Sequence, residues 1–375
     1  MAKSETGNPD KSRHIPTLDG WRAVAILLVV AHHAGTAFYT ETDYYSVSPT
    51  RFGTWGVPVF FGLSGVLITK LLLEEFDRTG RMSLKSFYTR RAFRILPPVF
   101  AFMAVVAALG LLASGMEAAS GLFFFRNYLP SSLGGIYTGH LWSLAVEEHF
   151  YLIWPVLLVL FGTRRGFVVA GSLSIALALW NSADYHWHLY ARVFPGVTNT
   201  SRSDLRLIGL FCGCTMAFLL HRPASKEWLR RYFTLGVWIL VALAFPICLE
   251  YQPYLLSLWL AIIIPLLMVG TVLHPAWAVS RVLDLKPVKW IGRISYSLYL
   301  WQQIFLMPSW DATPLGALQR WPLNILVMMI CACASYYVIE KPLNRLGHRL
   351  AARSASPRIN ASQLVVTEPA TAGVE

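Results

Sequence analysis

The chain has 375 residues, of which 55% are hydrophobic and 14% are charged, and its mean hydropathy is +0.49. An average soluble domain carries about 25% charged residues, so the composition excludes an ordinary soluble protein and predicts an all-α, polytopic integral membrane protein. The formal net charge of +12 could indicate a nucleic-acid partner, but the basic residues follow a membrane pattern, so we expect no nucleic-acid binding.

Ten apolar stretches are predicted to cross the membrane as helices. Several are shorter than the roughly 20 residues that a straight span needs, so we expect some of them to be tilted, broken or enclosed by protein. The ten stretches lie at about residues 21–39, 55–73, 95–113, 143–161, 167–180, 204–220, 233–249, 254–273, 294–309 and 321–339.

Basic residues concentrate in alternate connections between these stretches. One set of connections holds 26 of the 32 Lys and Arg residues, and the opposite set holds six. By the positive-inside rule, this asymmetry places both termini in the cytoplasm of a multi-pass protein of the cell (inner or plasma) membrane. We therefore expect a cytoplasmic segment (1–18), a transmembrane domain (19–345) and a cytoplasmic tail (346–375), whose Ala, Ser, Thr and Pro content predicts disorder.

The first stretch contains ionisable residues within an apolar helix. Arg22 and His33 are eleven residues apart, which is a rise of about 16 Å, and they share one helix face, whereas His32 points about 100° away. An ionisable side chain inside a membrane span is a functional candidate. We predict a functional role for His33, with packing in the core as the alternative.

The second stretch contains small residues at Gly62, Ser64 and Gly65. Small side chains let neighbouring helix backbones approach closely, so helix packing is one interpretation. The other is that Ser64 and Gly65 leave room for a ligand beside the first helix. The sequence alone does not separate the two.

The third stretch begins with clustered arginines. Arg91 and Arg94 are three residues apart, next to Arg90, and so are neighbours on a helix surface. Guanidinium groups suit phosphate oxygens, which favours a phosphorylated donor on the cytoplasmic side. The alternative is that these arginines only anchor the helix at the membrane surface.

The fourth stretch carries Ser143, Glu147 and Tyr151 near one helix face. Glu147 lies about one turn into the helix, beside aromatic residues, and is the better functional candidate there. We expect it to orient a histidine or an acceptor hydroxyl. Glu148 and His149 point away from this face, and a solvated helix start explains them.

Two later stretches are also informative. Arg202 and Asp204 are expected to pair at the start of the sixth span, with Asp204 capping the helix and acceptor binding as the alternative. The Ser, Tyr and Gln residues of the ninth span are expected to face the protein interior, because they are costly against lipid. The five cysteines lie in apolar stretches, so we expect packing roles and no metal site.

Together these stretches resemble the membrane-bound acyltransferase-3 family, the O-antigen acetylase-like enzymes. The family's Arg-x10-His pattern falls on Arg22 and His33. Its Arg-x-x-Arg pattern falls on Arg91 and Arg94, and its Val-Glu element falls on Glu147. The matching stretches run in family order at residues 18–23, 60–69, 87–97, 142–151, 200–204 and 294–301.

The chain also departs from the family pattern. Many members carry a histidine where this chain has Gln302, so no catalytic role is carried over to that position. His32 stands where the family usually has an aromatic or apolar residue. The fused extracytoplasmic hydrolase-like domain of larger members has no counterpart here, so we expect a stand-alone membrane unit.

The resemblance implies an acyltransferase that moves an acyl group, most often acetyl, from cytoplasmic acetyl-CoA or another acyl-CoA to a hydroxyl of a cell-envelope glycan or glycolipid sugar. His33 is the expected general base, with Glu147 as a second catalytic residue that fixes the histidine tautomer. The expected donor-binding residues are Arg22, Ser64, Arg91 and Arg94. The expected acceptor-binding residues are Trp142, Ser143, Tyr151, Arg202 and Asp204.

Other functions remain open at this point. A macrolide or another small metabolite is an alternative acceptor. A transporter or flippase of envelope precursors also fits ten spans with buried charges, and a non-catalytic partner in envelope assembly is a third hypothesis. Membrane lipid is an expected partner, and the sequence does not decide between a monomer and a homo-oligomer.

Overall fold

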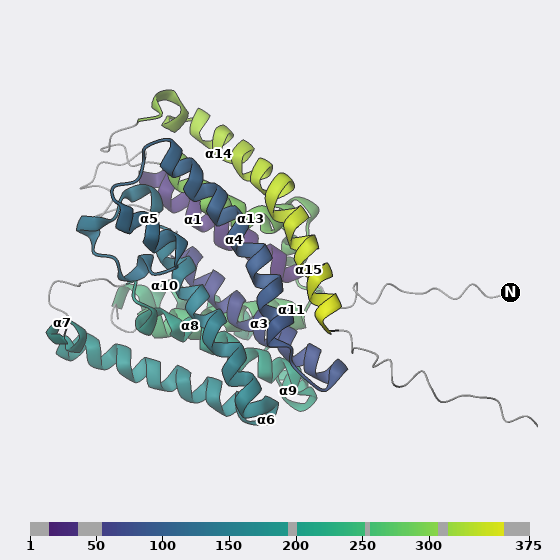
Figure 1. Ribbon diagram of the computed structural model, residues 1–375. Helices are drawn as coiled ribbons and strands as arrows, with labels where there is room; N and C mark the ends of the chain where they lie inside the picture. Colours follow the sequence, from purple (N-terminus) through teal and green to yellow (C-terminus); the bar gives the residue numbers. More distant parts are fainter. Residues whose placement is uncertain (1–14, 37–54, 194–200, 252–255, 307–313, 356–375) are drawn as a thin grey trace, which may run out of the picture.

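The computed structural model describes residues 15–36, 55–193, 201–251, 256–306 and 314–355, and these residues form helices and connections without a strand. Figure 1 shows long helices packed side by side into one bundle. The α-helices are α1 (Pro16–Thr36), α3 (Gly56–Thr79), α4 (Leu84–Ala108), α5 (Gly115–Leu122), α6 (Leu141–Trp187), α7 (Leu189–Val193), α8 (Ser203–His221), α9 (Pro223–Tyr232), α10 (Leu235–Tyr251), α11 (Leu256–Leu273), α12 (Ala278–Leu283), α13 (Lys286–Phe305), α14 (Leu323–Ala334) and α15 (Lys341–Ala355).

Shorter helical turns complete the described chain. The 3₁₀ turns η2 (Arg126–Tyr128), η3 (Ser131–Leu133) and η4 (Ile136–Thr138) lead into α6, and η6 (Gly316–Gln319) precedes α14. A π-helical segment, η7 (Ser335–Glu340), joins α14 to α15.

Each of the ten predicted spans falls mainly on a helix. Residues 109–113, 233–234, 306 and 321–322 lie beyond the helix ends, and residues 37–39, 254–255 and 307–309 lie outside the described residues. The fourth and fifth spans form one element, α6, which bends at Gly162. The backbone there has φ 70° and ψ 172°, a conformation that glycine adopts without the steric cost of a Cβ. A glycine between two apolar stretches thus lets the chain turn back without a loop.

Five helical segments are long and apolar enough to cross a membrane: Gly56–Thr79, Leu84–Ala108, Ile136–Trp187, Ser203–His221 and Leu323–Arg353. The more polar helices α1 and α13 do not meet the same criteria. They pack against each other, and α1 also packs against α3. Polar side chains in the second half of α13, among them Ser295, Ser297 and Gln302, are buried in protein, as membrane burial requires. The ten-span topology and the cytoplasmic position of both termini stay predictions.

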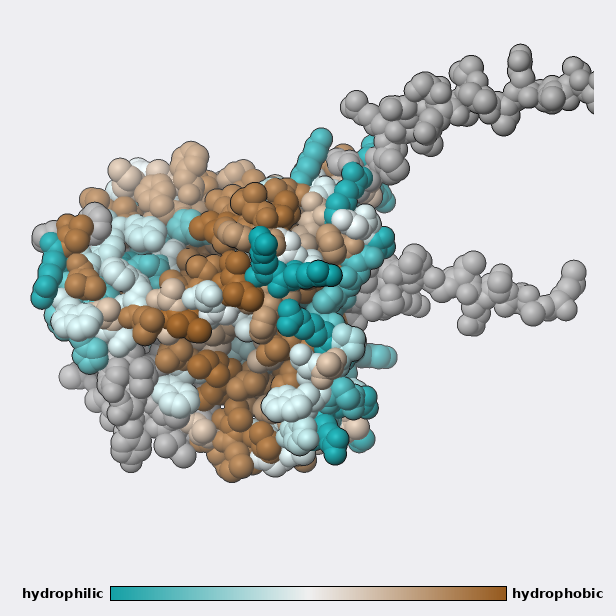
Figure 2. Space-filling view, turned by 90° about the horizontal axis from the view of Figure 1, so that it is seen from below, coloured by the Kyte–Doolittle hydropathy of each residue, from teal (hydrophilic) through white to brown (hydrophobic). Residues whose placement is uncertain are grey.

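The surface has an apolar middle and polar ends. Figure 2 shows brown, hydrophobic side chains across the middle of the molecule and teal, hydrophilic ones gathered toward the right. In Figure 1 the same end carries the α3–α4 turn, the α6 bend, α9 and the end of α15. These are connections in which the sequence concentrates Lys and Arg. The arrangement is the one expected of a helix bundle with one basic, membrane-flanking end.

Small residues allow α3 and α8 to pack closely. A side chain at Gly65 would collide with the Leu210 carbonyl, and one at Gly213 would collide with the Gly62 carbonyl. The packing interpretation of Gly62 and Gly65 is therefore confirmed.

Helices cross both predicted domain limits, and at the C-terminal limit the predicted disorder of residues 346–355 is wrong. Helix α1 already begins at Pro16, and Leu18 is buried in the core. At the other end α15 continues to Ala355, into the segment predicted to be a disordered tail. It is ordered because it packs against α4, with the Ser86 hydroxyl donating to the Ala351 carbonyl at 3.1 Å. Residues 1–14 and 356–375 lie outside the described residues.

Candidate active site

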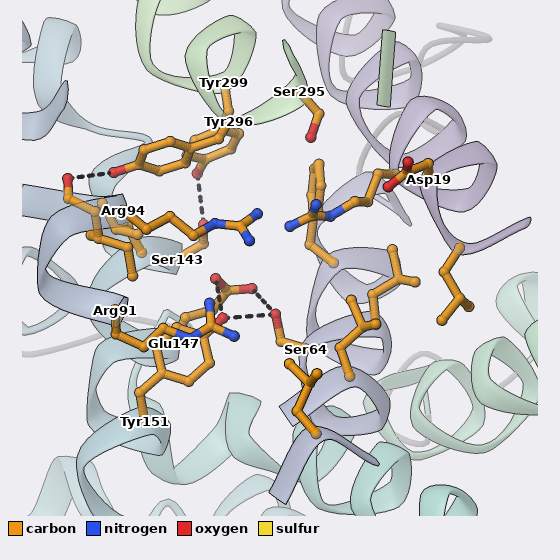
Figure 3. Close-up of a pocket in the computed structure, with 18 of the residues that line it drawn as sticks. Asp19, Ser64, Arg91, Arg94, Ser143, Glu147, Tyr151, Ser295, Tyr296 and Tyr299 are labelled. Atoms are coloured by element: carbon orange, nitrogen blue, oxygen red, sulfur yellow. Dashed lines mark hydrogen bonds between the residues drawn. The ribbon is translucent and has the colours of Figure 1, made fainter. Parts of the chain in front are cut away.

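A cavity of about 250 Å³ lies between α1, α3, α4, α6 and α13. Figure 3 shows its polar side chains pointing toward one another from these helices. Ile15 and Leu18 line it at the start of α1, so the cavity reaches the basic end of the bundle. Seven of the predicted site residues line it: Arg22, Ser64, Arg91, Arg94, Ser143, Glu147 and Tyr151.

Three of these residues are arginines from two helices. Arg22 comes from α1, and Arg91 and Arg94 come from adjacent turns of α4, as their spacing predicts. None of the three forms an ion pair with a carboxylate among the residues that the structure describes. The guanidinium carbon of Arg91 lies 4.4 Å from the centre of the Tyr151 ring, a cation–π contact that holds the group in place.

The neighbouring Arg90 differs. Its guanidinium pairs with Glu75 at 3.2 Å, and it does not line the cavity. Arg90 therefore holds α4 against α3, whereas Arg91 and Arg94 face the cavity.

Glu147 lies at the centre of a hydrogen-bond network across the cavity wall. The Ser64 hydroxyl donates to one carboxylate oxygen at 2.9 Å, and the Tyr151 hydroxyl donates to the other at 3.0 Å. Ser64 and Tyr151 are themselves 2.9 Å apart. Glu147 and Tyr151 can share this network because they are four residues apart on one face of α6. With three arginines around it, the cavity carries an excess of positive charge, which favours an anionic ligand.

The opposite wall comes from α13. Ser295, Tyr296 and Tyr299 line the cavity, and the sequence predicted only that this helix turns its polar residues inward. The Tyr299 hydroxyl lies 2.6 Å from that of Ser143, and the Tyr296 hydroxyl donates to the Ile95 carbonyl at 3.0 Å. Nothing local in the sequence marks these residues for the site, because their partners lie on distant helices.

His33 does not line the cavity and lies farther along α1. Its Nδ1 is 3.0 Å from the Val29 carbonyl. A carbonyl only accepts hydrogen bonds, so Nδ1 carries the proton and Nε2 is the accepting nitrogen of the neutral ring. The expectation that Glu147 fixes this tautomer is therefore wrong: the Val29 carbonyl does so, and the carboxylate of Glu147 is bound by Ser64 and Tyr151.

The other predicted acceptor residues lie outside the cavity. Arg202 and Asp204 form the expected pair, with nitrogen–oxygen distances of 2.7 and 3.1 Å. Arg202 also binds Asp184 at 2.9 Å. Asp204 does not cap α8, because the capping position is Arg202 and the Asp204 carboxylate accepts from Arg202 and from Trp180.

Trp142 is a packing residue in this arrangement. Its ring meets Phe61 edge-on, with 6.2 Å between centres, and the guanidinium of Arg206 lies 5.5 Å from it. It therefore packs beside the cavity wall without lining it. No group of three or more metal-binding side chains occurs within the described residues.

Comparison with known proteins identifies the family of the chain. A family model described as an acyltransferase domain matches residues 15–340. The peptidoglycan O-acetyltransferase OatA of Listeria monocytogenes is 29% identical over 89% of this chain and 56% of its own length. A putative O-acetyltransferase of Staphylococcus aureus is 31% identical over 90% of this chain and 58% of its own.

A putative peptidoglycan O-acetyltransferase of Bacillus subtilis is 29% identical over 90% of this chain and 56% of its own length. The chain thus spans little more than half the length of these relatives. No solved structure matches it. The match over residues 15–340 covers the helices that form the cavity, and the chain belongs to the acyltransferase-3 family of membrane acyltransferases.

Proposed function

We propose that this chain is a membrane O-acetyltransferase that moves an acetyl group from cytoplasmic acetyl-CoA to a sugar hydroxyl of a cell-envelope glycan. Peptidoglycan is the favoured acceptor, because the names of two relatives specify it. The observation that carries the proposal is the cavity, in which three arginines without an ion-pair partner in the described chain surround Glu147 and its two hydroxyl donors.

The arginine end of the cavity is the proposed donor site. Coenzyme A carries phosphate groups, and guanidinium groups bind phosphate through paired, charge-assisted hydrogen bonds. Arg91 and Arg94 supply two such groups from one face of α4, and Arg22 supplies a third from α1. Ile15 lines the cavity at the basic end of the bundle. We infer that the donor enters from this end, with its thioester directed inward and its phosphates held at the arginines.

The reacting end is proposed to lie farther along α1, at His33. The rise from Arg22 to His33 is about 16 Å, and the cavity wall between them contains Ser64, Glu147 and the Ser143–Tyr299 pair. These side chains line the path that the thioester arm follows. The accepting Nε2 of His33 can then take the proton of an acceptor hydroxyl that arrives from the outer side.

The transfer balances without a further reactant. The acceptor oxygen attacks the thioester carbonyl carbon as its proton passes to His33. The new C–O ester bond forms and the C–S bond breaks, and the proton then goes from His33 to the departing thiolate. The products are the acetylated sugar and free coenzyme A. Glu147 is proposed to hold the Ser64 and Tyr151 hydroxyls in place beside the donor.

The test uses the full chain in lipid vesicles, supplied with acetyl-CoA and soluble glycan fragments. We expect acceptor-dependent thiol release together with an acetyl ester on the glycan, read by mass spectrometry. His33→Ala should lower kcat by about 100- to 10,000-fold, the range for loss of a general base, and His32→Ala serves as the matched control. Release of no thiol with any hydroxyl acceptor would remove the proposal and leave a transporter or flippase as the better hypothesis.

A further inference from the structure

Six buried polar atoms on four residues have no hydrogen-bond partner among the described residues. They are both ring nitrogens of His140, both amide atoms of Gln302, one oxygen of Gln303 and the indole nitrogen of Trp301. His140 is 5% exposed and Gln302 is fully buried. Buried polar atoms without partners cost free energy and are rare, so such a concentration calls for an explanation.

These residues belong to the start of α6 and the end of α13. Tyr299 connects the two elements: its hydroxyl donates to the His140 carbonyl, and the two rings are 5.2 Å apart. Gln302 lies three residues after Tyr299, on the same face of α13. The Gln302 side chain lies close to the ring of His33. The ring of His140 also lies close enough to His33 for the two to interact electrostatically.

The cluster continues directly from the cavity. Ser143 and Tyr299 line the cavity and are hydrogen-bonded to each other at 2.6 Å. His140 is seven residues before Glu147 on α6, which is about 10 Å nearer the start of that helix. Gln302 is seven residues after Ser295 on α13, so both lie beyond the arginine end. A thioester arm that passes Glu147 and Ser143 therefore reaches His140 and Gln302 next.

We propose that His140 and Gln302 bind the carbonyl oxygen of the acyl group beside His33 and stabilise its negative charge during transfer. This inference rests on the proposed function. A neutral imidazole offers one N–H and a glutamine amide offers two, and neither adds charge to the site. When the acceptor oxygen attacks, the C=O electrons move onto the carbonyl oxygen, and donors held in place at that oxygen lower the barrier.

The surroundings support donors held in advance rather than mobile side chains. The His140 ring lies edge-on to Phe102 at 5.4 Å, and Phe102 also meets the Trp301 ring at 5.9 Å. The backbone of His140 is held by Tyr299. Aromatic packing thus restrains the His140 ring, and burial keeps water away from both His140 and Gln302; both conditions strengthen a hydrogen bond to a developing charge.

The experiment compares His140→Ala, Gln302→Ala and Gln302→His in the full chain in vesicles. Removing one such donor is expected to lower kcat by about 100-fold, with the KM for acetyl-CoA changed by less than about twofold because the donor phosphates bind elsewhere. Gln302→His keeps an N–H and should recover most of the lost kcat. The double variant should lose less than the product of the single losses, because both donors serve one oxygen.

Ser335→Ala is the matched control, because it also removes a buried polar atom without a partner in the described chain, but on η7. It should keep the wild-type kcat. The inference is overturned if the His140 and Gln302 variants keep kcat while remaining folded, which would mean that water alone fills the cluster. It is also overturned if the variants lose kcat only in proportion to a fall in their thermal unfolding midpoint. A rise in the KM for acetyl-CoA with an unchanged kcat would overturn it as well. Inactivity of the wild type itself would instead overturn the proposed function.

Discussion

The arginines of this protein occupy two different environments. Around the cavity, Arg22, Arg91 and Arg94 have no ion pair with any described carboxylate. At the start of α8, Arg202 binds Asp204 and Asp184, and its guanidinium carbon lies 3.5 Å from the centre of the Tyr190 ring. The cavity arginines therefore have N–H groups that can bind a ligand. The N–H groups of Arg202 already bind carboxylates, and one face of its guanidinium already contacts the Tyr190 ring.

The difference separates binding from structure. A buried arginine that is already paired stabilises the fold only while its partners remain, and a ligand would have to break those bonds. An arginine held by an aromatic ring keeps its N–H groups available. This contrast supports the proposal that the cavity arginines bind the acetyl donor, and it indicates a structural role for the cluster of Arg202, Asp184 and Asp204.

The largest expected effect is from the double variant Arg91→Ala/Arg94→Ala. A hydrogen bond to a charged group contributes about 1.5–3 kcal/mol, so losing both groups should lower kcat/KM for acetyl-CoA by at least about 100-fold. Thiol release over a range of donor concentrations measures it. Arg90→Ala, which breaks the pair with Glu75, should stay within about twofold. An equal loss in that control would mean that general positive charge, and not these two positions, attracts the donor.

The next effect concerns stability. Arg202→Ala leaves Asp184 and Asp204 without their partner. Removing one member of a buried pair costs about 3–5 kcal/mol, and we expect about 3 kcal/mol because the Asp204 side chain is 31% exposed and partly solvated. Denaturant unfolding followed by tryptophan fluorescence measures this loss. The KM for acetyl-CoA should not change; a marked rise would contradict the structural assignment.

Ligand-dependent stability sharpens the same contrast. A ligand at 100 times its Kd stabilises a folded protein by about 2.7 kcal/mol, so coenzyme A should raise the unfolding midpoint of the wild type. Arg202→Ala should start lower but show the same increase. Arg91→Ala/Arg94→Ala should show almost none at equal coenzyme A concentration. A full increase in that double variant would place the phosphate site elsewhere.

The smallest effect is expected at Ser64. Ser64→Ala removes the hydroxyl that contacts both Glu147 and Tyr151, and a net hydrogen bond is worth about 1 kcal/mol, or about fivefold in kcat. The same hydrogen bond contributes about 1 kcal/mol to folding stability, so the unfolding midpoint should fall only slightly. Gly65→Ala is the contrasting variant, because its Cβ would collide with the Leu210 carbonyl, so it should lose folded protein. If Ser64→Ala lost folded protein and Gly65→Ala lost only activity, Ser64 would be the packing residue and Gly65 the residue of the site.

Much of the fold follows from local pattern. Apolar stretches with helical length predicted the helices, and most of the residues named on α1, α4 and α6 converge on one cavity, whereas His33 and Trp142 do not line it. The three-residue spacing of Arg91 and Arg94 and the four-residue spacing of Glu147 and Tyr151 were enough to place each pair on one face. These are properties of single helices, so the sequence contains them directly.

Other features depend on contacts between helices. Ser64 meets Glu147 across 83 residues, and Ser143 meets Tyr299 across 156. No local spacing predicts which faces of two helices pack together. The roles of Ser295, Tyr296 and Tyr299 in the cavity wall were missed for this reason, as was the replacement of Glu147 by the Val29 carbonyl as the partner of His33.

By itself, the sequence determined the helical class, the distribution of charge and most of the candidate residues that line the cavity, because the 3.6-residue helix period and the cost of polar groups in lipid act locally. Only the tertiary structure decided which of the candidate residues face the cavity and which pair with other side chains. It left Arg91 and Arg94 facing the cavity, paired Arg90 with Glu75 and Arg202 with Asp184, and brought His140 and Gln302 beside His33. The physical reason is that the partners of a side chain are set by helix packing, which joins residues far apart in the chain.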